Sequence, residues 1–72
     1  MPKAIIRNRV REIRESKVMS QAALAESCGC TRQTIIMLEQ ERYVPSLSLA
    51  FAIAESLECP LEEIFQVEKR TA

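Results

Sequence analysis

The most reactive side chains in this 72-residue sequence belong to three cysteines, Cys28, Cys30 and Cys59. Structural zinc sites use four ligands, and paired cysteines are usually two to four residues apart, whereas a single residue separates Cys28 from Cys30. The sequence has no histidine to complete such a site, so we expect no metal and no other cofactor. Small core side chains in a reducing compartment explain the cysteines, and a thiol or metal sensor is the alternative.

Enzymatic chemistry is equally hard to build from this chain. It contains neither histidine nor aspartate, which removes the residues most often used in acid–base and metal-assisted catalysis. It also has no glycine-rich phosphate-binding loop, because it has only one glycine. We therefore expect a protein that binds rather than catalyses.

The pattern of residues 29–40, GCTRQTIIMLEQ, predicts a helix whose apolar residues are too many for one buried face. Ile35, Ile36, Met37 and Leu38 are four consecutive apolar residues, but neighbours on a helix point about 100° apart. One buried face cannot take all four. Either the helix is buried all round, against another helix or a dimer partner, or Ile36 and Met37 are kept apolar for something outside the domain.

The length and composition predict one small globular domain over residues 1–72. A chain this short is near the limit at which one core supports a fold without metal, disulfide or partner, so a second copy is a reasonable expectation. Apolar residues make up 47% and charged residues 28%, as in folded chains. No signal peptide is recognisable, and no apolar run approaches the ~20 residues that cross a membrane. We expect a cytoplasmic protein without a membrane partner.

The charge is zero overall but uneven along the chain. A formal net charge of zero by itself argues against a strong nucleic-acid binder. However, residues 1–17 carry six basic residues against two glutamates, and residues 43–72 carry five glutamates against two basic residues. A neutral molecule with this distribution can still present a positive face.

Polar capping residues and apolar periodicity predict five short helices. We expect helices over about 9–16 and 21–28, a third that begins after residue 31, a fourth from 45–46 to about 58, and a fifth from 60. The expected caps are Asn8, Ser20, Thr31 and Ser46, with Pro45 and Pro60 at helix starts and Gly29 as a left-handed helix end.

Apolar spacing identifies the buried face of each predicted helix. The third helix should bury Ile35 and Leu38, which lie three residues apart. The fourth should bury a broad stripe, and the fifth should turn three residues inward. The stripe consists of Leu47, Ala50, Ile53, Ala54 and Leu57, and the inward residues of the fifth helix are Leu61, Ile64 and Phe65.

Short β-branched and aromatic segments stand at both ends of the chain. Ala4-Ile5-Ile6 and Phe65-Gln66-Val67 could pair as a small β-ribbon formed by the two termini. The predicted fold class is therefore all-α, with five helices and this ribbon as an optional addition.

Residues 20–40, SQAALAESCGCTRQTIIMLEQ, combine two of the predicted helices into a motif. Each helix has about two turns, Gly29 lies in the connection, and Ala25 is small where the helices must cross closely. This is the layout of a helix-turn-helix, in which the first helix spans the DNA backbone and the second enters the major groove.

From Asn8 to Phe65 the chain resembles the Cro and lambda-repressor-type regulators, also called XRE-type. The matching pattern is SQxxLAxxxGxTRQTIxxLEQxRYxPSLxLAxxIAxxLxxPLEEIF. The resemblance implies a minimal, single-domain member with a five-helix lambda-repressor-like fold, working as a homodimer on an inverted repeat in a prokaryote or phage. We expect a sequence-specific regulator of double-stranded DNA, most simply a repressor, without a small-molecule effector.

The resemblance also assigns roles to individual positions. Arg14 and Glu39 match a structural ion pair between the first helix and the end of the third. Gln21 matches a position whose amide reaches a backbone phosphate, and it could also brace Gln33.

Base contacts are implied at Arg32, Gln33 and Met37, with Ile36 beside them. Arginine can bind guanine O6 and N7, glutamine can bind adenine N6 and N7, and apolar groups contact the thymine methyl. An ordinary solvated first turn is the alternative for Arg32 and Gln33. Further phosphate contacts are expected at Thr34, Gln40, Arg42 and Tyr43.

Three positions depart from the family pattern. Glu41 and Glu58 replace the Gly or Asn that family members often place in a left-handed conformation, and Lys17 replaces a common Gly. We therefore expect those helix ends to be built differently. Glu41 also brings a negative charge near the expected phosphates, which should weaken non-specific binding.

Two alternatives remain open from the sequence. Phe51, Ile64, Phe65 and Val67 are expected in the core, but some could form the dimer interface instead. A protein-interaction module, such as an antitoxin or adaptor, could use Ile36 and Met37 against another polypeptide.

Overall fold

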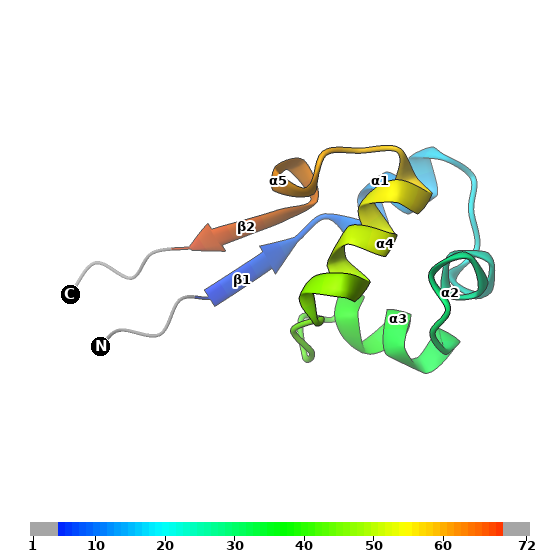
Figure 1. Cartoon of the computed structure of the whole chain (residues 1–72), viewed down its shortest axis with the longest axis horizontal. Helices are drawn as coiled ribbons and strands as arrows, with labels where there is room; N and C mark the ends of the chain where they lie inside the picture. Colours follow the sequence, from blue (N-terminus) through cyan, green and yellow to red (C-terminus); the bar gives the residue numbers. More distant parts are fainter. Residues whose placement is uncertain (1–4, 69–72) are drawn as a thin grey trace.

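The computed structural model describes residues 5–68, which form five helices and two short strands (Figure 1). The helices cross one another around a common core, and the strands pair at one end of the molecule. In chain order the elements are β1 (Ile5–Asn8), α1 (Val10–Ser16), α2 (Gln21–Cys28), α3 (Arg32–Glu39), α4 (Leu47–Leu57), α5 (Leu61–Ile64) and β2 (Phe65–Glu68).

Three of the predicted caps hold their helices as expected. The hydroxyl groups of Ser20, Thr31 and Ser46 each accept a hydrogen bond from the backbone N–H three residues later, at 3.0–3.2 Å. These bonds satisfy donors that have no partner inside the helix. The starts of α2, α3 and α4 are therefore fixed by interactions within four residues of sequence.

Asn8 is part of β1 and does not occupy the cap position of α1, which belongs to Arg9. Its side chain nevertheless accepts a hydrogen bond from the Val10 N–H at 3.2 Å and donates one to the Leu38 carbonyl at 2.9 Å. The predicted cap was thus wrong in position. The same amide instead ties the start of α1 to the end of α3.

The core lies where the five helices meet. Its fully buried side chains come from every helix: Val10, Leu24, Ile35, Leu38, Ile53, Leu57 and Ile64.

The buried stripe of α4 is narrower than predicted. Leu47 and Phe51 were expected inside, yet they are 69% and 52% exposed. They lie four residues apart on the side of α4 that faces away from the core, whereas α4 packs mainly against α2 and α5. The helical periodicity of Ala50, Ile53 and Leu57 identified the buried side of α4 correctly. How far that buried side extends around the helix depends on which elements pack against it.

Four helices end with the same hydrogen bond, although only one of them ends in glycine. A backbone N–H returns to the carbonyl five residues earlier, after a residue with positive φ. The donor and acceptor pairs are Met19 and Arg14, Cys30 and Ala25, Arg42 and Met37, and Cys59 and Ala54, at 3.0–3.1 Å.

The expectation of differently built helix ends was therefore wrong. Glu41 (φ 60°) and Glu58 (φ 51°) adopt the left-handed conformation themselves. After α1 the left-handed residue is Val18 (φ 55°), not Lys17 (φ −94°). Side chains that rarely adopt this conformation are held in it because the capping bond and the packing of the next element require it.

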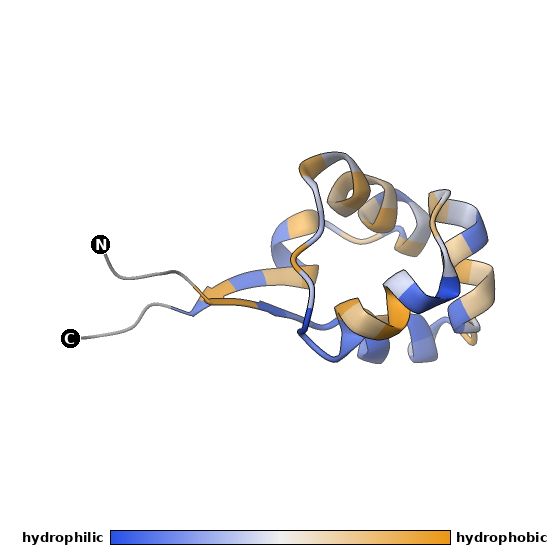
Figure 2. Ribbon diagram, turned by 90° about the horizontal axis from the view of Figure 1, so that it is seen from below, coloured by the Kyte–Doolittle hydropathy of each residue, from blue (hydrophilic) through white to orange (hydrophobic). Residues whose placement is uncertain are grey.

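The predicted ribbon is confirmed by the antiparallel pairing of β1 with β2. Ile6 lies opposite Val67, and Asn8 lies opposite Phe65. Ala4, which was also predicted to pair, lies outside the described residues. The ribbon extends from the helical body at the end opposite α2 (Figures 1 and 2). Within residues 5–68, no helix is both long and apolar enough to span a membrane.

Candidate nucleic-acid interface

The first turn of α3 faces solvent while its other side is anchored. Ile35 and Leu38 are fully buried, whereas Arg32 and Gln33 are exposed and Thr34 is half-buried. Three further predicted contacts, Gln40, Arg42 and Tyr43, are exposed just after α3. The polar residues assigned to DNA contact are therefore accessible on α3 and the segment after it.

Ile36 and Met37 are half-buried, which is neither of the two arrangements that the sequence suggested. The domain covers part of each side chain and leaves part accessible. Such positions can contact a thymine methyl without exposing a large apolar surface in the free protein.

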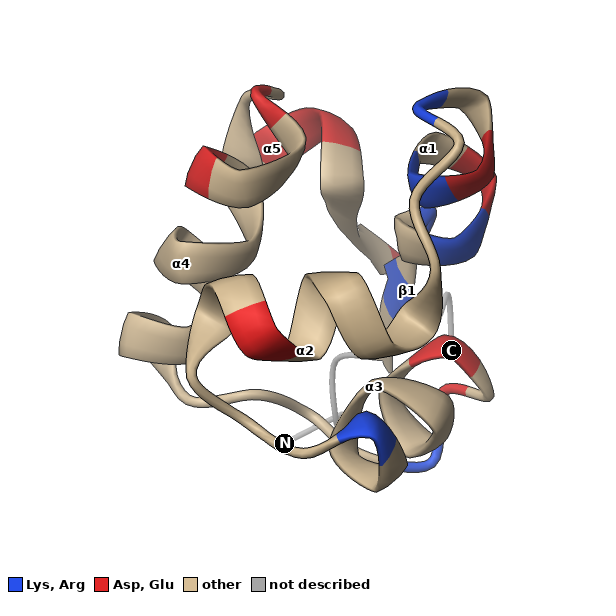
Figure 3. Cartoon of the chain, turned by 90° about the vertical axis from the view of Figure 1, so that its right-hand side faces the viewer, with Lys and Arg blue, Asp and Glu red and all other residues tan. Residues whose placement is uncertain are grey.

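The glutamates of α5 and the basic first residue of α3 lie on opposite sides of the helical body (Figure 3). Figure 3 shows α5, with its glutamates, at the top and α3, with its basic first residue, at the bottom. Glu62 and Glu63 lie in the first turn of α5. A globally neutral chain thus keeps its acidic C-terminal part away from the exposed turn of α3.

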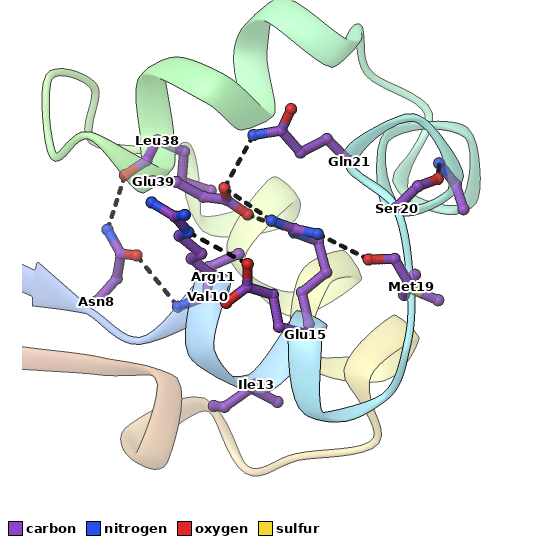
Figure 4. Close-up of polar contacts among 12 residues, drawn as sticks. Asn8, Val10, Arg11, Ile13, Glu15, Met19, Ser20, Gln21, Leu38 and Glu39 are labelled. Carbon is purple, nitrogen blue, oxygen red and sulfur yellow. Dashed lines mark hydrogen bonds and ion pairs between the residues drawn. The ribbon is translucent and has the colours of Figure 1, made fainter.

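The ion pair between Arg14 and Glu39 is present and buried (Figure 4). Arg14 Nε donates to Glu39 Oε2 at 2.7 Å and Nη2 donates to Oε1 at 3.2 Å. Nη1 donates to the Met19 carbonyl at 2.7 Å. The hydrogen bond to Glu39 raises the pKa of Arg14, so this cation stays charged. The pair fixes the end of α3 to α1 and to the loop before α2.

Gln21 belongs to the same network and not to a pair with Gln33. Its Nε2 donates to Glu39 Oε1 at 3.0 Å (Figure 4), and no hydrogen bond joins it to Gln33 among the described residues. The bracing role that was predicted toward Gln33 is therefore directed to Glu39. One amide hydrogen of Gln21 remains to donate to a phosphate, and its amide oxygen can accept from water.

A shallow hollow between α1 and the starts of α2 and α3 contains Arg11, to which the sequence assigned no role. Arg11 lines it together with Ser20, Gln21 and Arg32. Its ion pair with Glu15, at 3.4 Å, is exposed and therefore weak. The signal in the sequence was the spacing of three residues between Arg11 and Arg14, which places both on one side of α1.

The negative charge of Glu41 has a local counter-charge. Arg7 Nη1 lies 3.2 Å from Glu41 Oε1, and Nη2 lies 3.3 Å from Glu68 Oε2. The hydrogen bond to Glu41 raises the pKa of Arg7. The sequence missed this compensation because 34 residues separate the two partners.

The three cysteines are half-buried and free. Within residues 5–68 no group of three metal-ligating side chains comes together. Burial raises the pKa of the Cys30 and Cys59 thiols, which keeps them protonated and slow to react at neutral pH. Cys59 Sγ donates to Glu63 Oε2 at 3.5 Å.

The four candidates for a dimer interface separate into two groups. Ile64 is fully buried in the core and cannot contact a second chain. Phe65 is half-buried, and Val67 and Phe51 are exposed, which corrects the expectation that all four lie in the core.

Together the fold and the exposed first turn of α3 define a helix-turn-helix DNA-binding domain. A family model described as helix-turn-helix matches residues 10–64. The chain is 46% identical over 65 residues to an uncharacterized HTH-type transcriptional regulator of Methanothermobacter thermautotrophicus, covering 89% of this chain and 94% of that protein. It is 39% identical over 64 residues to the uncharacterized HTH-type transcriptional regulator YgzD of Bacillus subtilis, covering 89% and 97%.

A solved structure supports the same assignment. The restriction-modification controller protein C.AhdI of Aeromonas hydrophila aligns with a TM-score of 0.71 at 30% identity, over 75% of this chain and 78% of that one. This chain belongs to the XRE-type helix-turn-helix family. It is a DNA-binding transcriptional regulator.

Proposed function

We propose that the protein is a repressor that binds an inverted repeat in double-stranded DNA as a homodimer. The observation that carries this proposal is the orientation of α3, which buries Ile35 and Leu38 and exposes Arg32 and Gln33. A helix held from one side with polar residues on its first turn fits the dimensions of the major groove.

In this proposal Arg32 and Gln33 read base edges. Within the described residues, Arg32 makes no side-chain hydrogen bond or ion pair that would hold it away from a guanine, and Gln33 can pair with an adenine. Ile36 and Met37 contribute their accessible apolar parts toward thymine methyl groups.

Phosphates would be bound on both sides of α3. Gln21 and Thr34 lie in the first turns of α2 and α3, near the positive ends of the helix dipoles, which favour anions. Gln40, Arg42 and Tyr43 follow α3. Arg11, which lines the same hollow as Arg32, joins this set as an additional candidate.

The DNA site is obtained first, by selecting bound sequences from random duplexes. We expect two half-sites related by a two-fold axis and separated by about one helical turn. Fluorescence anisotropy with the selected duplex then compares the parent with Arg32→Ala and Gln33→Ala. Each variant should lose about 1–3 kcal/mol of binding free energy and should tolerate base changes in one part of the half-site.

Arg9→Ala is the matched control, because Arg9 is an exposed arginine of the same charge paired with Glu12 and lies outside the hollow beside α3. It should bind the selected duplex nearly as well as the parent does. Parent-like binding by both α3 variants, with no dependence on salt, would exclude α3 as the reading element.

Repression is tested separately with a reporter promoter that overlaps the selected site. Expression of the parent should reduce the reporter signal, whereas Arg32→Ala should leave it unchanged. An increase in reporter signal would instead assign the protein as an activator.

A further inference from the structure

Glu15 lies in the hollow where the proposed function brings a DNA phosphate to Arg11. Three arginines line this hollow, Arg11, Arg14 and Arg32, and Glu15 is the only acidic residue among the described residues that line it. A carboxylate at this place repels the phosphates that the arginines attract. Glu15 therefore opposes DNA binding at the point where Arg11 favours it.

The three arginines of the hollow are not equally free to bind a phosphate. Arg14 is neutralised by Glu39 through the buried pair at 2.7 Å. Arg11 is paired with Glu15, with Nε 3.4 Å from Oε2 (Figure 4). Arg32 is exposed and makes no side-chain hydrogen bond or ion pair within residues 5–68. Of the two exposed arginines in the hollow, Glu15 thus occupies one.

The pair between Arg11 and Glu15 is weak enough for a phosphate to displace the carboxylate. Its side chains are 72% and 56% exposed, and exposed pairs four residues apart on a helix add little stability. A phosphate oxygen accepts hydrogen bonds from a guanidinium as a carboxylate oxygen does. Arg11 can therefore exchange Glu15 for a phosphate, and breaking the pair lowers the net free energy of DNA binding.

Glu41, a second carboxylate near the expected phosphates, differs from Glu15 in its partner. It pairs with Arg7 of β1 at 3.2 Å, and Arg7 has no expected contact with DNA. This pair therefore leaves the arginines expected to contact DNA free. Glu15 weakens binding in two ways, because it repels the phosphate and also occupies Arg11.

We infer that Glu15 competes with the DNA phosphate for Arg11 and so limits how tightly the domain binds DNA of any sequence. The inference rests on the phosphate contact of Arg11 in the proposed function and adds the group that opposes it. Phosphate contacts carry no direct sequence information. Glu15 should therefore lower the affinity for every duplex by a similar factor, whereas Arg32 is expected to distinguish bases.

Fluorescence anisotropy with a duplex of scrambled sequence compares the parent with Glu15→Gln. At about 50 mM salt the variant should bind about threefold more tightly, and its affinity should fall more steeply with salt, by about one additional released counterion. Glu12→Gln is the matched control, because it removes the same charge from an exposed pair on α1, with Arg9. Glu12 does not line the hollow, so this variant should bind nearly as the parent does.

A double-mutant cycle separates competition from simple repulsion. If Glu15 and the phosphate exclude each other on Arg11, Arg11→Ala should weaken binding about twofold more in the Glu15→Gln background than in the parent. Only in that background does the phosphate contact of Arg11 break no ion pair. Equal losses in the two backgrounds, or a Glu12→Gln variant that gains as much as Glu15→Gln, would overturn the inference.

Urea unfolding verifies that Glu15→Gln folds as the parent does. We expect the buried pair to stay intact, because the hydrogen bond to Glu39 is the main cause that raises the pKa of Arg14 and the charge of Glu15 is a lesser one. Parent-like unfolding would assign the change in affinity to the hollow itself. A destabilised Glu15→Gln variant without tighter DNA binding would overturn the inference.

The duplex selected for the proposed function is measured beside the scrambled one. Glu15→Gln should gain by a similar factor on both, whereas Arg32→Ala should lose more on the selected duplex. A gain confined to the selected duplex would overturn the inference. If selection yields no inverted repeat, the proposed repressor function fails, while a gain of Glu15→Gln on the scrambled duplex still supports the competition.

Discussion

Two ion pairs connect distant parts of the chain to the C-terminal end of α3, and they differ in burial and in support. Arg14–Glu39 is closed at 2.7 Å, with side chains only 9% and 5% exposed, and it gains hydrogen bonds from Gln21 and to the Met19 carbonyl. Arg7–Glu41 is longer, at 3.2 Å, and its side chains are 53% and 33% exposed.

The difference in burial indicates that Arg14–Glu39 holds α3 in place, whereas Arg7–Glu41 only offsets a surface charge. Removing water from a charge is costly, so the buried pair is stable only because Gln21 and the Met19 carbonyl form further hydrogen bonds with its charged groups. Loss of either partner would leave a buried charge without a counter-charge. The exposed pair competes with water and salt and contributes little to folding. We therefore expect α3 to depend on Arg14 for its position, while Arg7 mainly neutralises Glu41.

The largest effect should come from Arg14→Ala. Glu39 would remain buried without its cation, which typically costs about 3–5 kcal/mol, a large fraction of the ~5–15 kcal/mol that stabilises a small domain. Urea unfolding followed by circular dichroism measures the loss. The double variant Arg14→Met, Glu39→Leu is the control, because replacing both charges often restores stability. If Arg14→Ala lowered the free energy of unfolding no more than loss of an exposed pair does, the buried pair would not hold α3 in place.

Gln21→Ala should have an intermediate effect. Removal of a hydrogen bond to a charged, partly buried group costs roughly 1.5 kcal/mol or more, and the same unfolding measurement detects it. Gln21→Glu, which keeps the size but repels Glu39, should be worse. If Gln21→Ala unfolds like the parent but binds the selected duplex more weakly, the amide serves the phosphate alone.

Val18→Gly should increase stability by about 1 kcal/mol, because a β-branched residue is strained at φ 55° and glycine is not. Val18 directly precedes Met19, whose carbonyl accepts the bond from Arg14, so this substitution is made next to the buried network. Differential scanning calorimetry measures the change. Val18→Ala keeps a Cβ and should gain much less, whereas a lower melting temperature for the glycine variant would show that the backbone is relaxed there.

The smallest effect is expected for Arg7→Ala. Its unfolding midpoint in urea should lie close to that of the parent, and any difference should vanish in 1 M salt, where the Debye length falls to ~3 Å. Arg9→Ala is a suitable comparison, since Arg9 and Glu12 form another exposed pair. If Arg7→Ala lowered the free energy of unfolding in 1 M salt as well, the Arg7–Glu41 pair would contribute to the position of α3 as the buried pair does.

Much of the fold was predictable because the decisive interactions are local. Ser20, Thr31 and Ser46 cap helices through bonds to the third residue after them. The ribbon followed from β-branched and aromatic segments at the two ends. The exposure of Arg32 and Gln33 on α3 agrees with the first turn that the family pattern identified, although their contacts with DNA stay predictions.

Other features could not be predicted because they depend on which elements pack together. The sequence placed Leu47 in a buried stripe and Phe51 in the core, but both side chains are exposed on the outer side of α4. Val18, Glu41 and Glu58 are residue types that rarely adopt the left-handed conformation. They adopt it here because the backbone N–H of the next residue bonds to a carbonyl five residues earlier.

The sequence by itself determined where α2, α3 and α4 start and which residues anchor α3, because capping bonds and helical periodicity involve neighbours within a few positions. Only the tertiary structure decided that Gln21 supports Glu39, that Arg7 offsets Glu41, and that α4 and the ribbon line one apolar hollow. Each of these contacts joins residues far apart in the chain, and their distances are set by the packing of the whole helical body.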